Sequence, residues 1–213
     1  MLARGVTRPF ADEEESTVAK RPAPAANQPA ARPAARRAPA ARSKRRLMQP
    51  IPLDIPRLKC YGCSPENVYG LKLHFFRLGD EVIAEFTAAK HLQGWYGMIH
   101  GGILCTLIDE LAVWTVAGLR QRLGVTRDIQ VQYKRPMYIG EPMKLKGQIA
   151  EEKPALFKVK GQLINERGDV CVEGDVTVFL LDEQQFARMT PGGQVPEALH
   201  EYFGPPKPPP RRR

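Results

Sequence analysis

One apolar stretch constrains the fold of this chain more than any other feature of its sequence. From His100 to about Leu123 there is no proline, although the chain has 20 prolines in 213 residues, and apolar side chains occupy nearly every position. A helix that is apolar on most faces is buried on most sides. Gly101 and Gly102 open the stretch, and Gly124 follows it as a candidate C-cap. The sequence therefore predicts one long buried helix that other elements must enclose.

Strand-like segments flank the predicted helix on both sides. Before it, GLKLHFFRL and EVIAEFTA alternate apolar and polar side chains around a Gly-Asp turn, which predicts a hairpin. After it come four runs that prolines and glycines separate, at 127–135, 143–151, 155–166 and 169–181. Because no βαβ alternation is present, this order favours an α+β architecture in which an antiparallel sheet curls around one helix.

The net charge of +9 is confined to the ends of the chain. Residues 1–47 hold eleven Lys and Arg against four Asp and Glu, and residues 204–213 hold four basic residues and no acidic one. The remaining residues, 48–203, therefore carry a net charge of −2. A folded part with this charge does not present a basic surface for phosphates, so we expect no nucleic-acid partner.

Composition also predicts the domain boundaries. Residues 1–47 are rich in Ala, Pro and Arg, and we expect a disordered tail or an upstream leader to a true start at Met48. The folded domain is expected over 48–190, with an extended opening segment at 48–69. A Pro- and Arg-rich C-terminal tail is expected over 191–213.

The apolar run within the predicted helix is shorter than the roughly 18 residues that a membrane helix needs. The run 111–119 is preceded directly by Asp109 and Glu110, and no hydrophobic core of a signal peptide follows the first basic residues. Four cysteines in a chain of this length do not make a disulfide scaffold. We therefore expect a cytoplasmic protein without a membrane span.

Two features of the predicted helix carry chemistry. The N–H groups of Gly101 and Gly102 have no intrahelical partner, and glycine lets a carbonyl approach closely, so both are candidate oxyanion donors. Asp109 and Glu110 interrupt the apolar surface. Adjacent helical positions point about 100° apart, so one carboxylate should face the site and the other solvent or a partner. The alternatives are that the glycines only allow close packing and that both acids form caps or salt bridges.

The motif GWYGMIHGGILCTLIDE at 94–110 resembles the helix-opening motif of the hotdog-fold thioesterases, specifically the PaaI-like acyl-CoA thioesterases. YKRPMYIGEPMKLKGQI at 133–149 is similar to the strand pair that follows in that family, and CYGCSPENVYGLKLHFF at 60–76 to an opening segment of one branch. The resemblance implies a hotdog fold, an antiparallel curved sheet wrapped around one long central helix. It also implies hydrolysis of an acyl-CoA substrate to a free acid and CoA, without a metal or other cofactor.

The resemblance assigns roles to individual residues. Asp109, nine residues after His100, takes the position of the catalytic carboxylate, which acts as general base on water or as nucleophile. Thr126 matches a hydroxyl that holds the water or the carboxylate. His100 matches the histidine that orients the loop and the acyl carbonyl, and its alternative is a structural imidazole. Some relatives carry Asn six residues before this histidine, where this sequence has Gly94 beside Gln93, so carbonyl polarisation by that amide is in doubt.

Sites for phosphates and metals have weaker support in the sequence. No P-loop or dinucleotide fingerprint is present, so the phosphates of CoA must meet scattered cations. Lys134 and Arg135 are candidates, although a solvated strand end explains them equally well. CYGC at 60–63 has a metal-like spacing, but no second Cys or His pair follows at zinc-ligand spacing. We therefore predict no metal and interpret the motif as two small residues buried in a turn.

Helix geometry adds an expectation about assembly. Gly101 and Asp109 are eight residues apart, or about 12 Å along a helix, which is more than an Asp side chain spans. The two groups at one thioester should therefore come from two subunits of a homodimer, alone or as a dimer of dimers in a homotetramer. Three alternative functions remain: a non-catalytic acyl-CoA-binding hotdog protein, a hotdog hydratase with an Asp/His pair, and an adaptor that binds through its basic tail.

Overall fold

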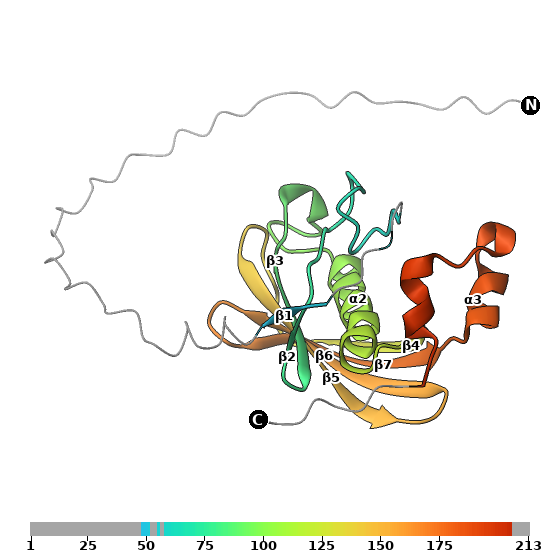
Figure 1. Cartoon of the computed structure of the whole chain (residues 1–213). Coiled ribbons are helices and arrows are strands. Elements are labelled where there is room, and N and C mark those ends of the chain that lie inside the picture. The colour runs from blue at the N-terminus through green and yellow to red at the C-terminus, as the bar shows by residue number, and fades with distance from the viewer. Residues whose placement is uncertain (1–47, 52–54, 56–57, 206–213) are drawn as a thin grey trace, which may run out of the picture. The chain divides into compact units, whose positions relative to one another are not determined.

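One antiparallel sheet curves around a single long helix (Figure 1). The structure is a computed structural model that describes residues 48–51, 55 and 58–205. The helix is α2 (Gly101–Arg120), and a short helix, η1 (Lys90–Leu92), precedes it. The strands, in order across the sheet, are β1 (Gln49–Pro50), β2 (Phe76–Leu78), β3 (Glu81–Thr87), β5 (Pro142–Glu152), β6 (Leu156–Asn165), β7 (Val170–Leu180) and β4 (Gly124–Tyr133). The predicted architecture is confirmed, whereas the predicted tail at 1–47 lies outside the described residues.

The ends of α2 are set by its flanking residues. His100 is the N-cap: its backbone is extended, and its Nδ1 accepts a hydrogen bond from the Gly102 N–H at 3.0 Å. At the other end, Gln121 takes the left-handed conformation (φ 50°) and closes the last turn. The prediction of Gly124 as the C-cap is therefore wrong. Gly124 begins β4 instead, where a Cβ would lie 2.6 Å from the carbonyl oxygen of Phe179.

Three glycines let the sheet approach α2 closely. Gly147, Gly161 and Gly174 are neighbours across β5, β6 and β7. A Cβ on Gly147 would lie 2.1 Å from Thr115 Oγ1, and one on Gly174 would lie 2.3 Å from Ile108 Cγ2. These separations are too short for a van der Waals contact. The helix therefore crosses the sheet over a row of positions at which side chains do not fit.

We expect Gly174→Ala to lower the free energy of unfolding by about 1–3 kcal/mol, the typical cost of an extra methyl group in a filled core. The added Cβ must displace Ile108, which is fully buried. Gly204→Ala is the matched control, because nothing lies within 4 Å of a Cβ built at Gly204. Urea unfolding measures the difference, and equal midpoints for the two variants would contradict the close contact between α2 and β7.

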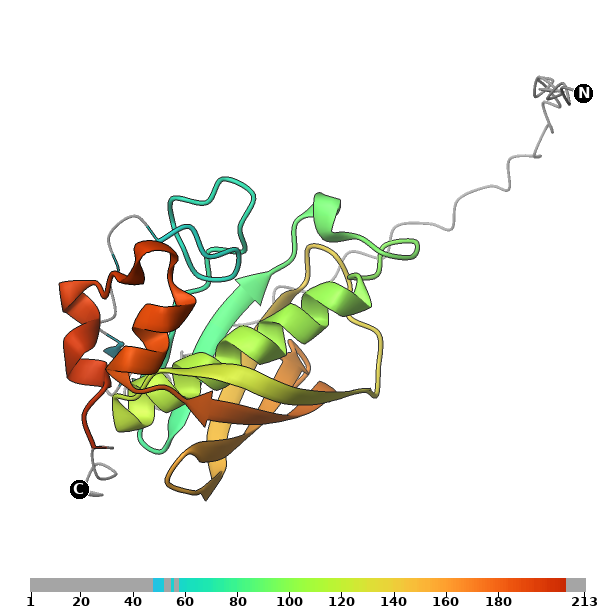
Figure 2. The same cartoon turned by 90° about the vertical axis from the view of Figure 1, so that its right-hand side faces the viewer.

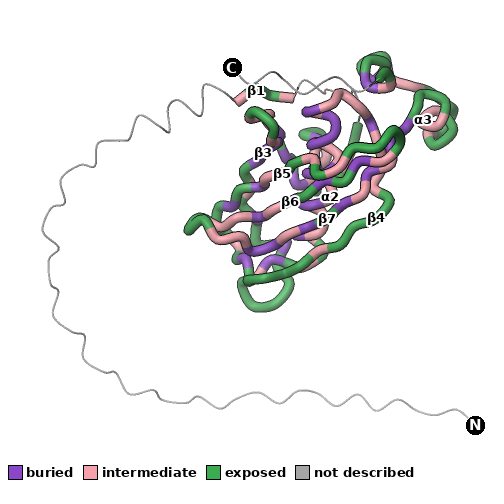
Figure 3. The backbone as a smooth tube through the Cα atoms, turned by 90° about the horizontal axis from the view of Figure 1, so that it is seen from below, coloured by how far each residue is buried: buried purple, intermediate pink, exposed green. Residues whose placement is uncertain are grey.

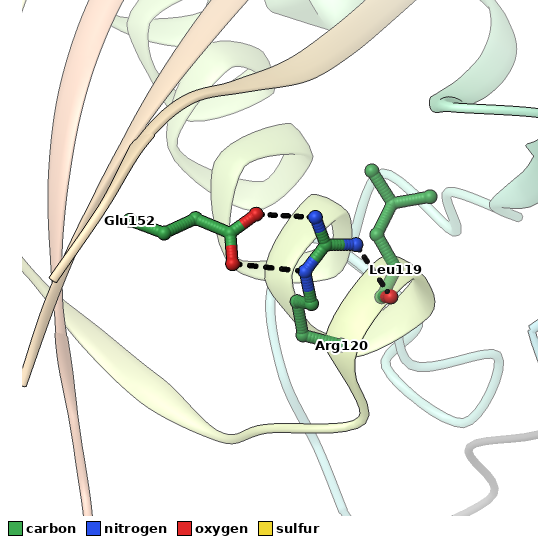
Figure 4. Close-up of polar contacts among 3 residues, drawn as sticks. All are labelled: Leu119, Arg120 and Glu152. Atoms are coloured by element: carbon green, nitrogen blue, oxygen red, sulfur yellow. Dashed lines mark hydrogen bonds and ion pairs between the residues drawn. The ribbon is translucent and has the colours of Figure 1, made fainter. Parts of the chain in front are cut away.

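An ion pair fixes the last turn of α2 to β5 (Figure 4). Arg120 binds Glu152 in a bidentate pair, in which Nε donates to Oε2 at 3.1 Å and Nη2 contacts Oε1. The remaining nitrogen, Nη1, donates to the backbone carbonyl of Leu119 at 3.0 Å. Because only 12% of the Arg120 side chain is exposed, this pair is less screened than an ordinary surface ion pair. A cation here also complements the partial negative charge at the end of the helix.

The hydrophobic core surrounds α2. Leu107, Ile108 and Leu111 are fully buried, and β3 to β7 all contact the helix. By length and composition α2 is also apolar enough to cross a membrane, a property that it shares with the core helices of folded domains. Figure 3 shows buried residues along the helix and the inner strands, whereas most of β4 is exposed.

The segment before β3 forms a shorter strand than its alternation predicts. The sequence predicts one strand over residues 70–78, but only β2 pairs with β3. Lys72 takes the left-handed conformation (φ 54°) and interrupts the extended backbone. The N–H groups of Leu71 and Leu73 bond to carbonyls of the preceding loop, 60–63, and both side chains are buried. The alternation therefore predicted the burial of Leu71 and Leu73 correctly. Their backbone, however, pairs with the 60–63 loop and not with β3.

The folded part of the chain extends past residue 190, where the sequence predicts a tail. After α3 (Glu183–Met189) come two short helices, η2 (Pro191–Gly193) and η3 (Glu197–Tyr202). Leu199 and Tyr202 are buried in a small cluster that includes Ala117 near the C-terminal end of α2, and Figure 2 shows these helices beside that end. Isolated apolar residues among Pro, Gly and charged residues give no periodic pattern, so the sequence analysis did not predict this packing.

Candidate active site

Asp109 lies on the flank of α2 that faces β4. Its side chain is half-buried, and its Oδ1 accepts a hydrogen bond from Thr126 Oγ1 at 2.5 Å. Thr126 lies at an irregularity of β4, because the register with β7 shifts between Thr126 and Asp128, and a bulge of this kind re-aims the neighbouring side chain. The structure thus brings together two residues that the sequence analysis placed at the site. The hydroxyl group holds one carboxylate oxygen, and no described residue bonds to Oδ2.

Glu110 points away from Asp109, as adjacent positions on a helix require. Its Oε1 lies 3.1 Å from Cys60 Sγ, in the loop that covers another side of α2 (teal in Figure 2). A hydrogen bond from Cys63 lowers the pKa of the Cys60 thiol to about 5. Burial, reinforced by the bond to Cys60, raises the pKa of the Glu110 carboxyl to about 8. Glu110 is therefore held mainly as the neutral acid at neutral pH.

The two glycines at the N-terminus of α2 differ in their hydrogen bonds. The Gly102 N–H is bonded to His100 Nδ1, whereas the Gly101 N–H has no acceptor among the described residues. The Gly101 carbonyl accepts a hydrogen bond from the Tyr133 hydroxyl at 2.9 Å. We expected both N–H groups to be oxyanion donors. Of these two groups, only the Gly101 N–H lacks a protein acceptor among the described residues. The residue that sequence reasoning missed is Tyr133, because a contact between a strand and a helix 32 positions away leaves no local pattern.

The two predicted substrate-binding cations have protein partners. Lys134 pairs with the Glu173 carboxylate, and Arg135 Nη1 donates to the Val170 carbonyl at 3.3 Å. Both side chains belong to exposed residues directly after Tyr133, at the end of β4. They therefore lie at the same end of the strand as the Gly101 contact, and their binding of CoA phosphates stays a prediction.

The loop before α2 does not supply the amide that some related sequences carry. A Cβ on Gly94 would lie 3.0 Å from His100 Cα, so a larger residue must shift this loop. The neighbouring Gln93 side chain accepts a hydrogen bond from the Gly97 N–H at 3.2 Å. Its amide oxygen is therefore engaged within the loop, and of these two positions only the Gln93 NH2 group could donate to a carbonyl.

β4 is an exposed edge strand. Among the described strands β7 is its only partner, so the other edge presents unpaired N–H and C=O groups. Ile129 and Tyr133 on this strand are 37% and 53% exposed. Trp95 and Tyr96, in the loop before α2, are 75% and 92% exposed. A long open edge with apolar side chains is a surface suited to pairing with another chain.

Comparison with known proteins identifies the fold of this domain. The family model of the thioesterase superfamily matches residues 96–172, a segment that contains His100, Gly101, Asp109 and Thr126. No curated protein matches the chain. The antiparallel sheet and its central helix form the hotdog fold, as the resemblance implied.

Solved thioesterase structures share this fold. One thioesterase superfamily protein is 25% identical, with a TM-score of 0.53 over 56% of this chain and 59% of that protein. A hypothetical thioesterase of Streptococcus pneumoniae TIGR4, solved with coenzyme A, is 21% identical, with a TM-score of 0.48 over 51% of this chain and 85% of that chain. The PaaI protein of E. coli, from the phenylacetic acid degradation operon, is 12% identical, with a TM-score of 0.49 over 52% and 80%. The family match and the first of these structures confirm the resemblance to the hotdog-fold thioesterases.

Proposed function

We propose that this protein is an acyl-CoA thioesterase whose catalytic carboxylate is Asp109. The observation that carries the proposal is the Asp109–Thr126 pair, a half-buried carboxylate that a hydroxyl group holds at 2.5 Å on the flank of α2 next to an open strand edge. The match of residues 96–172 to the thioesterase superfamily supports the same chemistry. The hydratase alternative needs an Asp/His pair, whereas the Nδ1 of His100 already accepts a hydrogen bond from the Gly102 N–H as the N-cap of α2.

Asp109 supports either of two routes to the same products. As general base it takes a proton from water, the resulting hydroxide adds to the thioester carbonyl carbon, and the C–S bond then breaks. As nucleophile its carboxylate oxygen adds to that carbon and expels the thiolate, and water hydrolyses the mixed anhydride. In both routes the departing CoA thiolate takes up a proton, and the Gly101 N–H stabilises the oxyanion that forms on the carbonyl oxygen.

The site proposed here needs two copies of the chain. Gly101 and Asp109 lie on one straight helix, about 12 Å apart along its axis, so they do not reach the same carbonyl within one copy. Both groups, however, are tied to β4: Asp109 to Thr126 near its start and Gly101 to Tyr133 at its end. The strand therefore fixes where the two halves of the site lie relative to its open edge.

When two copies pair through their β4 edges around a twofold axis, the Asp109 half of one site meets the Gly101 half from the other copy. In an antiparallel pair centred between Ile129 and Gln130, Thr126 of one copy lies opposite Tyr133 of the other. Asp109 of the first copy then approaches Gly101 of the second, and the symmetry creates two identical sites. The exposed edge and the exposed Ile129 side chain support this arrangement.

A panel of acyl-CoA thioesters with short, long and aromatic acyl groups tests the function, with released thiol as the readout. We expect catalytic release of free CoA from at least one member. A blank without substrate is required, because the chain has four free cysteines that react with thiol reagents. Label in the Asp109 carboxyl after a single turnover in isotopically labelled water identifies the anhydride route, with water attacking the Asp109 carbonyl carbon. Tight binding of acyl-CoA without thiol release would contradict the proposal and favour a non-catalytic acyl-CoA-binding protein.

A further inference from the structure

A second cluster of reactive side chains lies where the 60–63 loop meets α2, on another side of the helix from Asp109. Cys60, Cys63 and Glu110 each bring one potential ligand atom, and these three atoms lie within 4.8 Å of one another. The Cys60 Sγ to Glu110 Oε1 distance is 3.1 Å. None of the three takes part in the chemistry proposed for Asp109, so the cluster needs an explanation of its own.

The 60–63 loop is shaped around the Glu110 carboxyl group. A Cβ on Gly62 would lie 2.2 Å from Glu110 Cδ, so any larger residue would displace the Glu110 side chain from this position. The Gly62 N–H donates to Cys60 Sγ at 3.3 Å, a bond that stabilises a thiolate. The Gly62 carbonyl accepts a hydrogen bond from the Leu73 N–H at 2.9 Å, which anchors the loop to the segment before β2. The two sulfur atoms are therefore held toward the carboxyl group by the backbone itself.

The surroundings of the cluster are apolar. Trp114, one turn beyond Glu110, stacks on Phe75 with ring centroids 5.1 Å apart. Among the described residues, no lysine, arginine or histidine forms an ion pair with Glu110. Burial in apolar surroundings disfavours the charged forms of a carboxyl group and of thiols, and a bound divalent cation would favour them.

We propose that Cys60, Cys63 and Glu110 bind one thiophilic divalent cation, for which Zn²⁺ is the best match. Two thiolates and one carboxylate are ligands that Zn²⁺ accepts, with metal–sulfur distances of about 2.3 Å and metal–oxygen distances of about 2.1 Å. Tetrahedral geometry then places the ligand atoms about 3.5–3.8 Å apart, within the spread of this cluster. Cys60 and Glu110 need to separate by only about 0.5 Å to admit the ion.

Three protein ligands leave a fourth coordination position for water. A cavity of about 370 Å³ reaches the cluster, and its lining includes Cys63, Trp114 and Phe75. Water can therefore approach from the Cys63 side. The ion would tie the opening segment to α2 one residue after Asp109, and its role would be structural, because Glu110 points away from Thr126 and the open edge of β4.

Metal analysis of the full chain, purified without chelator from zinc-supplemented cells, tests the site. We expect one zinc ion per chain in the wild type and in Cys171→Ala, whose buried thiol lies in β7. Cys60→Ser, Cys63→Ser and Glu110→Gln should each lose stoichiometric zinc. Co²⁺ added to the reduced, metal-free wild type should give a sulfur-to-cobalt charge-transfer band, which the two cysteine variants lack.

A second readout needs no variant. Zinc should protect Cys60 and Cys63 from alkylation while Cys105 remains as reactive as in the metal-free protein, which peptide mass spectrometry resolves residue by residue. The proposal is overturned if the reduced wild type binds neither Zn²⁺ nor Co²⁺ stoichiometrically, or if Glu110→Gln binds zinc as tightly as the wild type. A Cys60–Cys63 disulfide whose reduced form takes up no metal would overturn it as well.

Discussion

Asp109→Asn is expected to lower kcat by about 10²–10⁴-fold if Asp109 is a general base, and by more if it is the nucleophile. The amide keeps the size of the carboxylate and an oxygen that accepts the Thr126 hydrogen bond, so the fold should persist. It neither takes a proton from water nor attacks a thioester. Steady-state thiol release by the purified variant measures the loss.

Two matched substitutions test whether the loss of turnover is specific to Asp109. Asp175→Asn makes the same chemical change at an exposed position of β7 and should leave turnover unchanged. Glu110→Gln makes the equivalent change at the adjacent position, which faces Cys60 rather than β4, and should cost less than Asp109→Asn. If Glu110→Gln is the more damaging of the two, the carboxylate that performs the chemistry is Glu110 and the assignment of Asp109 fails.

Gly101→Pro is expected to lower kcat by about 10²–10³-fold, the usual effect of removing one oxyanion donor. Proline deletes the N–H and little else at this position. Gly101 is the first residue of α2, where proline is tolerated, and His100 before it has the extended backbone that a following proline requires. Gly101→Ala is the control, since it keeps the N–H and its Cβ would meet Tyr133 at an ordinary 3.7 Å. Equal activities of the two variants would remove Gly101 from the oxyanion site.

The fold was predictable because its main elements have strong periodic patterns. The proline-free apolar stretch gave the central helix, and alternation with turn residues gave the hairpin before it and the four strands after it. The predictions failed where tertiary packing, and not the local sequence, determines the structure. Gln121 ends the helix in a left-handed conformation that no glycine marked, and Leu199 and Tyr202 dock on α2 from a segment without periodicity.

The site was predictable only in part, because some of its contacts join residues that are far apart in the sequence. The resemblance to the hotdog-fold thioesterases pointed to Asp109 and Thr126, and the structure shows them in contact. By contrast, the contact between Cys60 and Glu110 joins residues 50 positions apart, so a search for zinc ligands by sequence spacing could not find it. The prediction that CYGC binds no metal considered only nearby Cys and His partners, whereas folding brings a helical carboxylate to the two thiols.

Each active site is proposed to combine Asp109 of one chain with Gly101 of another. A mixed dimer tests this arrangement most directly. Asp109→Asn and Gly101→Pro chains, each inactive alone, are co-expressed with different affinity tags, and the doubly tagged heterodimer is purified. One of its sites collects both defects and the other has neither, so we predict about half of the wild-type turnover per dimer. Heterodimers with verified composition that remain as inactive as the parent variants would place both groups in one chain and contradict the shared site.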